Sequence, residues 1–252
     1  NGTGALKVLL TDAPASYDAV NVTISEVAVH YSGGQSTEEA AEETDGEQTA
    51  KIAGAWTTVS TQTQTFNLLN LQQGVTALLA NTTLPVGHYT QVRLTVSAAQ
   101  LVIEGEEVNP DIDVPSGIIK LVSGFDIEDG EATTLLIDFD AARSVIQTGE
   151  GQYKLKPVIR IMGQEEAGSI SGSVSNGSDP ITVIVKITGT EEIVASTIVQ
   201  DDGTFFLYVS SGVYDVEIVD STGPPALIWK LMGVNVAPGE SENIGNNIPL
   251  AL

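Results

Sequence analysis

Several residue types are scarce in this chain of 252 residues. It contains no cysteine, which excludes disulfides, thiolate metal sites and cysteine nucleophiles. Its two histidines, His30 and His88, lie far apart in the sequence, whereas an imidazole metal site normally recruits several ligands. No apolar run approaches the ~20 residues that a membrane helix needs. We therefore expect neither a zinc centre nor a membrane span.

Positive charge is also scarce, because 10 lysines and arginines stand against 33 aspartates and glutamates. The resulting net charge of -23 repels nucleic-acid phosphates and anionic lipids. A hydrophobic fraction of 42% is nevertheless enough for a substantial core. The composition predicts a folded acidic protein that does not bind nucleic acid and whose natural partners include cations.

Short runs of alternating apolar residues recur along the chain, as is typical of β-strands. The first run covers residues 5–11, and the second changes phase near Ser25 and Glu26, which predicts a β-bulge. Apolar residues at helical spacing predict one short helix within residues 66–79. The pattern predicts an all-β protein.

The last third of the chain contains GSISGSV, DDGTF and GVYDVEI between residues 168 and 218. Asp201, Asp202 and Gly203 separate two β-rich runs, which is a strong hairpin signal. This order of motifs resembles the carboxypeptidase regulatory-like domain, a transthyretin-like β-sandwich. The resemblance implies an appended module without catalytic groups in an exported multidomain protein.

A polar, glycine-flanked segment at residues 163–168 predicts a linker. We therefore expect two tandem β-sandwich domains of the immunoglobulin-like or transthyretin-like kind, at residues 1–165 and 166–252. The short helix belongs to the first of them.

Three phrases in the first half form a second set of motifs. They are LLTDAPASYDAVNVTISEV at 9–27, GHYTQVRL at 87–94, and LLIDFDAARSVIQTG with YKLKPVIRI at 135–161. Together they resemble an uncharacterised family of exported bacterial and archaeal proteins, often lipoproteins, over residues 5–162. The resemblance implies an all-β, cell-envelope or extracellular domain with no assigned reaction. Because the chain begins at Asn1 rather than methionine, we expect a processed, mature protein, and a trimmed chain would look the same.

Charged residues near the end of this half predict an ion-pair ladder. Asp138 and Asp140 share one side of their strand, and Lys156 and Arg160 share a face of the last strand, residues 153–162. Opposite charges across neighbouring strands commonly stabilise sheets, so a ladder is favoured over a catalytic carboxylate pair. We predict no catalytic residue, since no nucleophile and base can be named.

Clustered carboxylates make calcium the cofactor to consider, because hard cations bind several oxygens. The candidate ligands are Glu43, Asp45, Glu47, Asp111 and Asp113. None of these segments is an EF-hand. Solvated acidic loops are the alternative, particularly for the acidic stretch at residues 36–47.

Two functions fit these patterns. The first is a non-enzymatic extracellular or cell-surface structural protein, such as a filament or matrix subunit, that self-associates or binds other surface components. A strand carrying Leu6, Val8 and Leu10, or the C-terminal IPLAL, would complete the sheet of the next molecule. Both ends could equally pair within their own domains. The second function is an extracellular polysaccharide-binding module with Trp56 or Trp229 as a stacking platform.

Overall fold

The computed structural model describes residues 2–13, 15, 17–33, 54–108, 117–149, 151–175, 181–221 and 225–250. Within these residues the chain is almost entirely β-structure, arranged in several sheets. The helical segments are a short α-helix, α1 (Ala141–Ser144), and a 3-10 turn, η1 (Leu68–Leu71). The prediction of an all-β protein built from sandwiches is confirmed.

The first sheet has the strand order β12-β9-β1-β5. Its strands are β1 (Thr3–Ala13), β5 (Ala77–Pro85), β9 (Ala132–Asp140) and β12 (Ile159–Gly163). The central strand β1 runs antiparallel to β5 and parallel to β9. This arrangement places the LTDA, DFDA and VIRI motifs on three neighbouring strands.

The second sheet covers the first and has the order β3-β2-β6-β7, with β4 paired to β2 and β8 paired to β6. The strands are β2 (Ala19–Gly33), β3 (Ala55–Ser60), β4 (Gln64–Asn67), β6 (Gly87–Ile103), β7 (Glu106–Val108) and β8 (Ile118–Ile127). The register shifts around Ser25, so that Ile24 faces Val96 and Glu26 faces Thr95. The predicted bulge is therefore present.

The short helix predicted within residues 66–79 is a single 3-10 turn, η1, and the later part of that range is not helical. Only η1 is helical, and the Asn67 side chain caps it by accepting a hydrogen bond from the Leu69 N–H at 3.2 Å. Gly74 has a positive φ of 84°, and the chain then extends into β5. Leu79 and Ala80 are buried there in the sandwich core, so pairing with β1 prevails over the local helical spacing.

The predicted last strand of this half is also interrupted. Residues 153–155 form β11 (Tyr153–Leu155), which pairs with β10 (Val145–Gln147), whereas β12 pairs with β9. Pro157 lies between β11 and β12, and proline has no N–H to donate to a ladder. After the interruption the chain leaves the β10–β11 pair and joins the sheet of β9 as β12.

The second half forms two further sheets, with orders β16-β13-β19 and β15-β14-β17-β18, and β20 pairs with β13. The strands are β13 (Ala167–Ser175), β14 (Ile181–Ile187), β15 (Ile193–Ile198), β16 (Thr204–Ser210), β17 (Gly212–Asp220), β18 (Ala226–Val236), β19 (Ser241–Asn243) and β20 (Ile248–Pro249). The predicted turn between β15 and β16 is present, with Gly203 at φ 82°. Asp202 Oδ1 accepts a hydrogen bond from the Thr204 N–H at 2.9 Å.

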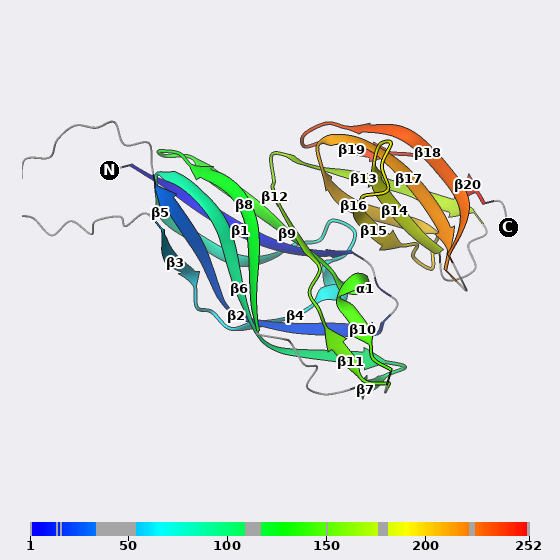
Figure 1. The fold of residues 1–252 in the computed structure, drawn as a ribbon, viewed down its shortest axis with the longest axis horizontal. Helices are drawn as coiled ribbons and strands as arrows, with labels where there is room; N and C mark the ends of the chain where they lie inside the picture. The colour runs from blue at the N-terminus through cyan, green and yellow to red at the C-terminus, as the bar shows by residue number, and fades with distance from the viewer. Residues whose placement is uncertain are drawn as a thin grey trace, which may run out of the picture.

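The two sets of sheets lie side by side along the long axis of the molecule (Figure 1). The expected polar linker is a short turn at residues 164–166, between the end of β12 and the start of β13. Beside it, Leu9, Leu136, Met162 and Ala167 form a small buried apolar cluster with Tyr208 of β16. The two sandwiches therefore share a packed junction. Among the described helices, none is long and apolar enough to cross a membrane.

Candidate functional site at the junction of the sandwiches

The carboxyl-terminal ends of β1 and β9 bring the motif carboxylates together at this junction. The two strands are parallel and in register, with Asp12 beside Phe139 and Ala13 beside Asp140. β12 runs antiparallel to β9 and places Arg160 opposite Asp138. The three aspartates, at 12, 138 and 140, are each no more than 5% exposed. The sequence motifs thus meet at one end of the sheet, with Asp138 and Asp140 on the face toward the second sandwich and Asp12, in register with Phe139, on the face toward the core of the first.

Arg160 links the two sandwiches. Its Nη2 donates a hydrogen bond to Asp138 Oδ2, and its Nη1 donates to the Val194 carbonyl of β15 at 2.6 Å. The side chain of Asp138 is 3% exposed and that of Arg160 is 22% exposed. A buried carboxylate of this kind needs a partner, and the guanidinium supplies one while also docking β15.

Asp140 makes a second contact between the sandwiches. Its Oδ1 accepts a hydrogen bond from the Arg143 N–H at 3.0 Å and so caps α1. Its Oδ2 accepts from the Ser196 hydroxyl of β15 at 3.3 Å. Burial raises the pKa of Asp140, and the hydrogen bond from the Arg143 backbone opposes this rise.

Asp12 is the least compensated of the three carboxyls. Its Oδ1 accepts a hydrogen bond from the Ala141 N–H at 2.9 Å, but its Oδ2 has no hydrogen-bond partner within the described residues. Burial raises the pKa of Asp12 to about 9, and the nearby charges of Asp138 and Asp140 add to the rise. Asp12 is therefore protonated at neutral pH.

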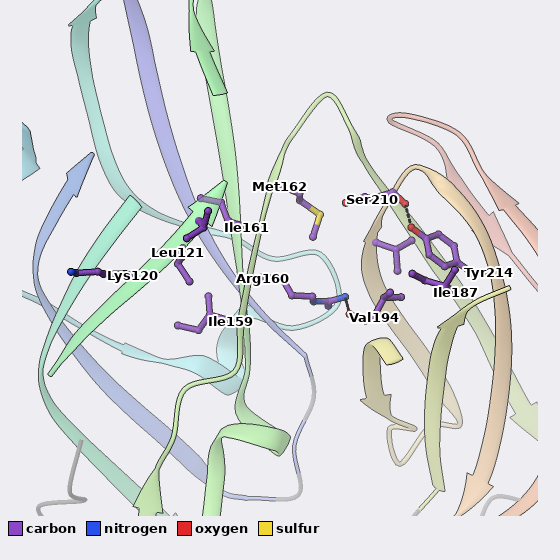
Figure 2. Close-up of a pocket in the computed structure, with 12 residues that line it drawn as sticks. Lys120, Leu121, Ile159, Arg160, Ile161, Met162, Ile187, Val194, Ser210 and Tyr214 are labelled. Atoms are coloured by element: carbon purple, nitrogen blue, oxygen red, sulfur yellow. Dashed lines mark hydrogen bonds between the residues drawn. The ribbon is translucent and has the colours of Figure 1, made fainter. Parts of the chain in front are cut away.

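A groove of about 540 Å³ opens on one side of the junction (Figure 2). Its walls come from β8 and β12 of the first sandwich and from β14 to β17 of the second. The lining residues are Lys120, Leu121, Val122, Ile159, Arg160, Ile161, Met162, Ile187, Val194, Val209, Ser210 and Tyr214. Arg160 crosses the middle of the groove toward Val194, and Lys120 points away from it (Figure 2). The lining is mostly apolar and contains no carboxylate.

The ion-pair ladder predicted from the sequence is only partly assembled. Arg160 pairs with Asp138, whereas the cation near Asp140 is Arg143, whose Nη1 lies 3.9 Å from Oδ2. Lys156 lies between β11 and β12, is exposed, and its backbone N–H donates to the Ser144 carbonyl at 2.8 Å. The break at Pro157 explains why Lys156 and Arg160 do not share a strand.

A further ladder, which was not predicted from the sequence, lies on the second sandwich. Lys186 of β14 contacts Glu217 of β17 at 2.8 Å, and Lys230 of β18 contacts the same carboxylate at 3.0 Å. The Lys186 ammonium holds the pKa of Glu217 below its usual range. The alternation of Glu217 with Val216 and Ile218 was a usable signal for this outer face.

The predicted metal ligands and strand donors lie elsewhere. Glu43, Asp45, Glu47, Asp111 and Asp113 are outside the described residues. Within the part of the chain that the structure describes, no group of three or more His, Cys, Asp or Glu residues is arranged to hold a metal ion. The strand-donation residues Leu6, Val8 and Leu10 are fully buried on the central strand β1, in the core of their own sandwich.

The two tryptophans have different surroundings. The Trp56 side chain lies beside His30 on β2, with ring centroids 5.2 Å apart, and the Arg93 guanidinium lies 4.6 Å from the Trp56 ring centroid. Arg93 also donates to Glu26 at 3.1 Å. Trp229 instead packs against the core of the second sandwich. Of the two tryptophans, Trp56 is therefore the one with polar and charged groups around its ring.

The first part of the chain has a family assignment. Residues 3–157 match the sequence family described as a domain of unknown function, DUF4382. Because this match covers more than half of the 252 residues, the chain belongs to that family. No curated protein matches the chain.

Solved structures give only distant similarities. The TIE protein of Bacillus anthracis is 10% identical with a TM-score of 0.27, and the match covers 99% of this chain and 34% of that one. The minor pilin GBS52 of Streptococcus agalactiae is 11% identical with a TM-score of 0.22, covering 98% and 96% of the two chains. The shaft pilin SpaA of Lactobacillus rhamnosus GG is 8% identical with a TM-score of 0.27, covering 98% and 97%. The chain spans about a third of the TIE protein, and TM-scores this low carry no functional conclusion.

Proposed function

We propose that this chain is a non-enzymatic structural protein of the cell surface or extracellular space. The observation that supports the proposal is that side chains of the sequence motifs bind the second sandwich. Arg160 and Asp140 each bond to β15 of the second sandwich, at 2.6 Å and 3.3 Å respectively. The charged groups of the first sandwich thus serve to fasten a second sandwich to it.

The fastening combines polar and apolar contacts. The Tyr208 hydroxyl of β16 donates to the Gly74 carbonyl at 3.4 Å, and the Met162 and Ala167 side chains are buried beside it. Buried interfaces with satisfied hydrogen bonds hold domains in one relative orientation. A pair of sandwiches of fixed orientation suits a building block that transmits force or spaces other components. In this proposal the second sandwich is an appended module of the carboxypeptidase regulatory-like kind.

Self-association by strand donation belongs to the same proposal. The candidate donor β1 has two strand neighbours, so donation requires β1 to exchange from one molecule to the next. The C-terminal candidate is held more weakly, because β20 pairs with β13 at only two positions. Each buried apolar side chain that an acceptor gains is worth ~1.5 to 3 kcal/mol. Homopolymers or contacts with other surface components would result.

A reversible cross-link distinguishes strand exchange from ordinary pairing. Lys7 and Asn81 face each other on β1 and β5 and are both exposed, and the chain has no cysteine of its own. The double variant Lys7→Cys with Asn81→Cys should assemble when reduced and remain monomeric when oxidised. If the oxidised protein assembles as well as the reduced one, β1 is not the donor.

The proposed location outside the cell can be tested on cells that produce the protein. Antibody labelling of intact cells and electron microscopy of the native material should show the protein outside the cell, in filaments or in a matrix. Protein confined to the interior of the cell would contradict the proposal.

Polysaccharide binding is the second candidate function, and the surroundings of Trp56 favour it. The indole lies on the outer side of the β3-β2-β6 sheet among groups that donate and accept hydrogen bonds, as sugar hydroxyls require. The His30 Nδ1 lies 2.9 Å from the Thr90 hydroxyl, which fixes the imidazole beside the indole. A rigid aromatic face bordered by fixed polar groups is suited to stacking on a pyranose ring.

The tryptophan content allows a direct test, because Trp56 and Trp229 are the two indoles of the chain. In a Trp229→Phe variant, the fluorescence of Trp56 should change on titration with soluble polysaccharides. Calorimetric titration, which needs no indole, should show that Trp56→Phe retains binding and that Trp56→Ala loses it. Unchanged fluorescence across neutral and acidic polysaccharides would remove this candidate.

A further inference from the structure

The outer face of the β3-β2-β6-β8 sheet carries two adjacent rows of side chains. Strand pairing places one residue of each strand in a first row, which is Thr58, Ala28, Arg93 and Lys120. The second row is Trp56, His30, Gln91 and Val122. Leu121, between Lys120 and Val122, is buried in the core, so both rows face outward. In a chain with 33 acidic and 10 basic residues, these rows hold two cations and no carboxylate.

The two cations stand directly opposite each other, Arg93 on β6 and Lys120 on β8. Like charges at such positions repel and destabilise a sheet. The Arg93 Nη2 donates to Glu26 Oε1 at 3.1 Å, which compensates one of them. Lys120 is exposed, points away from the groove at the junction (Figure 2), and forms no ion pair with any residue that the structure describes. An anion bound between the two side chains would replace this repulsion by attraction.

The aromatic ring of the second row lies within reach of the same cations. The Arg93 guanidinium is 4.6 Å from the centroid of the Trp56 ring, and His30 lies on the other neighbouring strand. From β3 to β8 there are three strand spacings, or about 14 Å, which is the length of a short oligosaccharide. The Gln91 amide lies between the ends of this span and can bond to sugar hydroxyls.

We propose that these rows bind an acidic polysaccharide, whose sugar ring stacks on Trp56 and whose carboxylate or sulfate groups bind Arg93 and Lys120. The inference rests on the polysaccharide binding proposed above for Trp56, and it adds the charge of the ligand. A guanidinium has five N–H donors and an ammonium three, so both cations retain donors for an anion. Hydrogen bonds between ionised groups are about twice as strong as neutral ones.

The net charge of -23 does not prevent such binding. At physiological ionic strength, exposed charges more than about 8 Å apart are largely screened from each other. The cations that touch the ligand therefore outweigh the acidic residues elsewhere on the surface.

Calorimetric titration of the whole chain tests the charge preference with matched probes. Polygalacturonate and its methyl ester have the same sugar chain with and without negative charge. The charged form should bind about tenfold more tightly, and the difference should shrink as salt is added. Dextran sulfate against dextran makes the same comparison for sulfate. Polyglutamate, which has carboxylates but no sugar rings, should bind no better than the methyl ester.

Substitution of the unpaired cation assigns the preference to this site. Lys120→Gln should lower the affinity for polygalacturonate about tenfold and leave that for the methyl ester unchanged. Lys120→Arg should keep the affinity, because it keeps the charge. Lys156→Gln removes another exposed lysine, outside the two rows, and should bind as the parent does.

The results separate this inference from the function on which it rests. Equal affinities for the charged and methylated forms would overturn the preference for acid and leave polysaccharide binding at Trp56 in place. No binding to any polysaccharide would remove both. Equal losses in Lys120→Gln and Lys156→Gln would overturn the assignment to these rows, as would polyglutamate binding as tight as that of polygalacturonate.

Discussion

Asp12 shows how one side chain can weaken the fold that its neighbours stabilise. The pKa of Asp12 is about 9 in the folded protein and 3.8 in an ordinary exposed position. Between these values the folded chain holds a proton that the unfolded chain has released. The free energy of unfolding therefore falls as pH rises through this interval, and levels off above the folded pKa.

The first prediction follows from this sign. Asp12→Asn should be more stable than the parent near pH 8, by about 1 to 5 kcal/mol, because the amide avoids the cost of protonation. It should also remove most of the loss of stability between about pH 5 and pH 9. Urea unfolding at several pH values measures both effects. Equal pH dependence in the two proteins would contradict the raised pKa.

Arg160 carries the second prediction. Arg160→Gln removes the partner of the buried Asp138 and should cost about 3 to 5 kcal/mol, since it leaves an uncompensated buried charge. Adding Asp138→Asn should recover part of this loss. Denaturant unfolding of the two single variants and the double variant completes the cycle. Strictly additive losses would mean that the two side chains do not interact.

At the scale of elements, the alternation of apolar residues and the turn residues were sufficient to predict most strands. The bulge at Ser25 was visible as a change of apolar phase, and the turn at Asp201 to Gly203 as a turn signature between β-rich runs. The helical spacing of residues 66–79 corresponds to a real turn at residues 68–71 and was misleading beyond it, because Leu79 and Ala80 are buried through pairing with a distant strand. Local spacing carries no information on such a partner.

The junction could be predicted only in part. The motifs containing Asp12, Asp138 and Arg160 were recognisable, and alternation placed Asp138 opposite a cation. Nothing local indicated that β1 runs parallel to β9, which is the pairing that brings Asp12 beside the other carboxyls. The α1 helix was missed as well, since four residues are too short to show a period.

The third prediction concerns the two sandwiches as elements. Residues 166–252 should fold alone, because the second sandwich has its own core around Ile170, Val183, Phe205 and Val216. Circular dichroism and dispersed amide NMR signals would show this. An unfolded fragment would mean that the junction contacts are required, and that the boundary near residue 165 is wrong.

At the scale of the whole molecule, a net charge of -23 opposes both compactness and self-association. The fourth prediction is that millimolar calcium stabilises the chain, because a cation that binds the folded state raises its stability by mass action. Thermal melts with calcium, or with chelator at matched ionic strength, measure the shift. Identical melting temperatures would leave the acidic residues, including Glu43 and Asp111, as solvating charge.

The last prediction is that two sandwiches held in one orientation serve as a unit of assembly. Salt should favour assembly by screening the repulsion between acidic copies. Contact between copies should therefore appear at high ionic strength or with calcium, and disappear at low ionic strength.

Sedimentation velocity of the purified chain tests this account most directly. A concentration series in low salt, high salt and calcium should show a monomer that converts reversibly to larger species as the charge is screened. A chain that remains a monomer at every concentration and in every solution would contradict the structural role proposed for it.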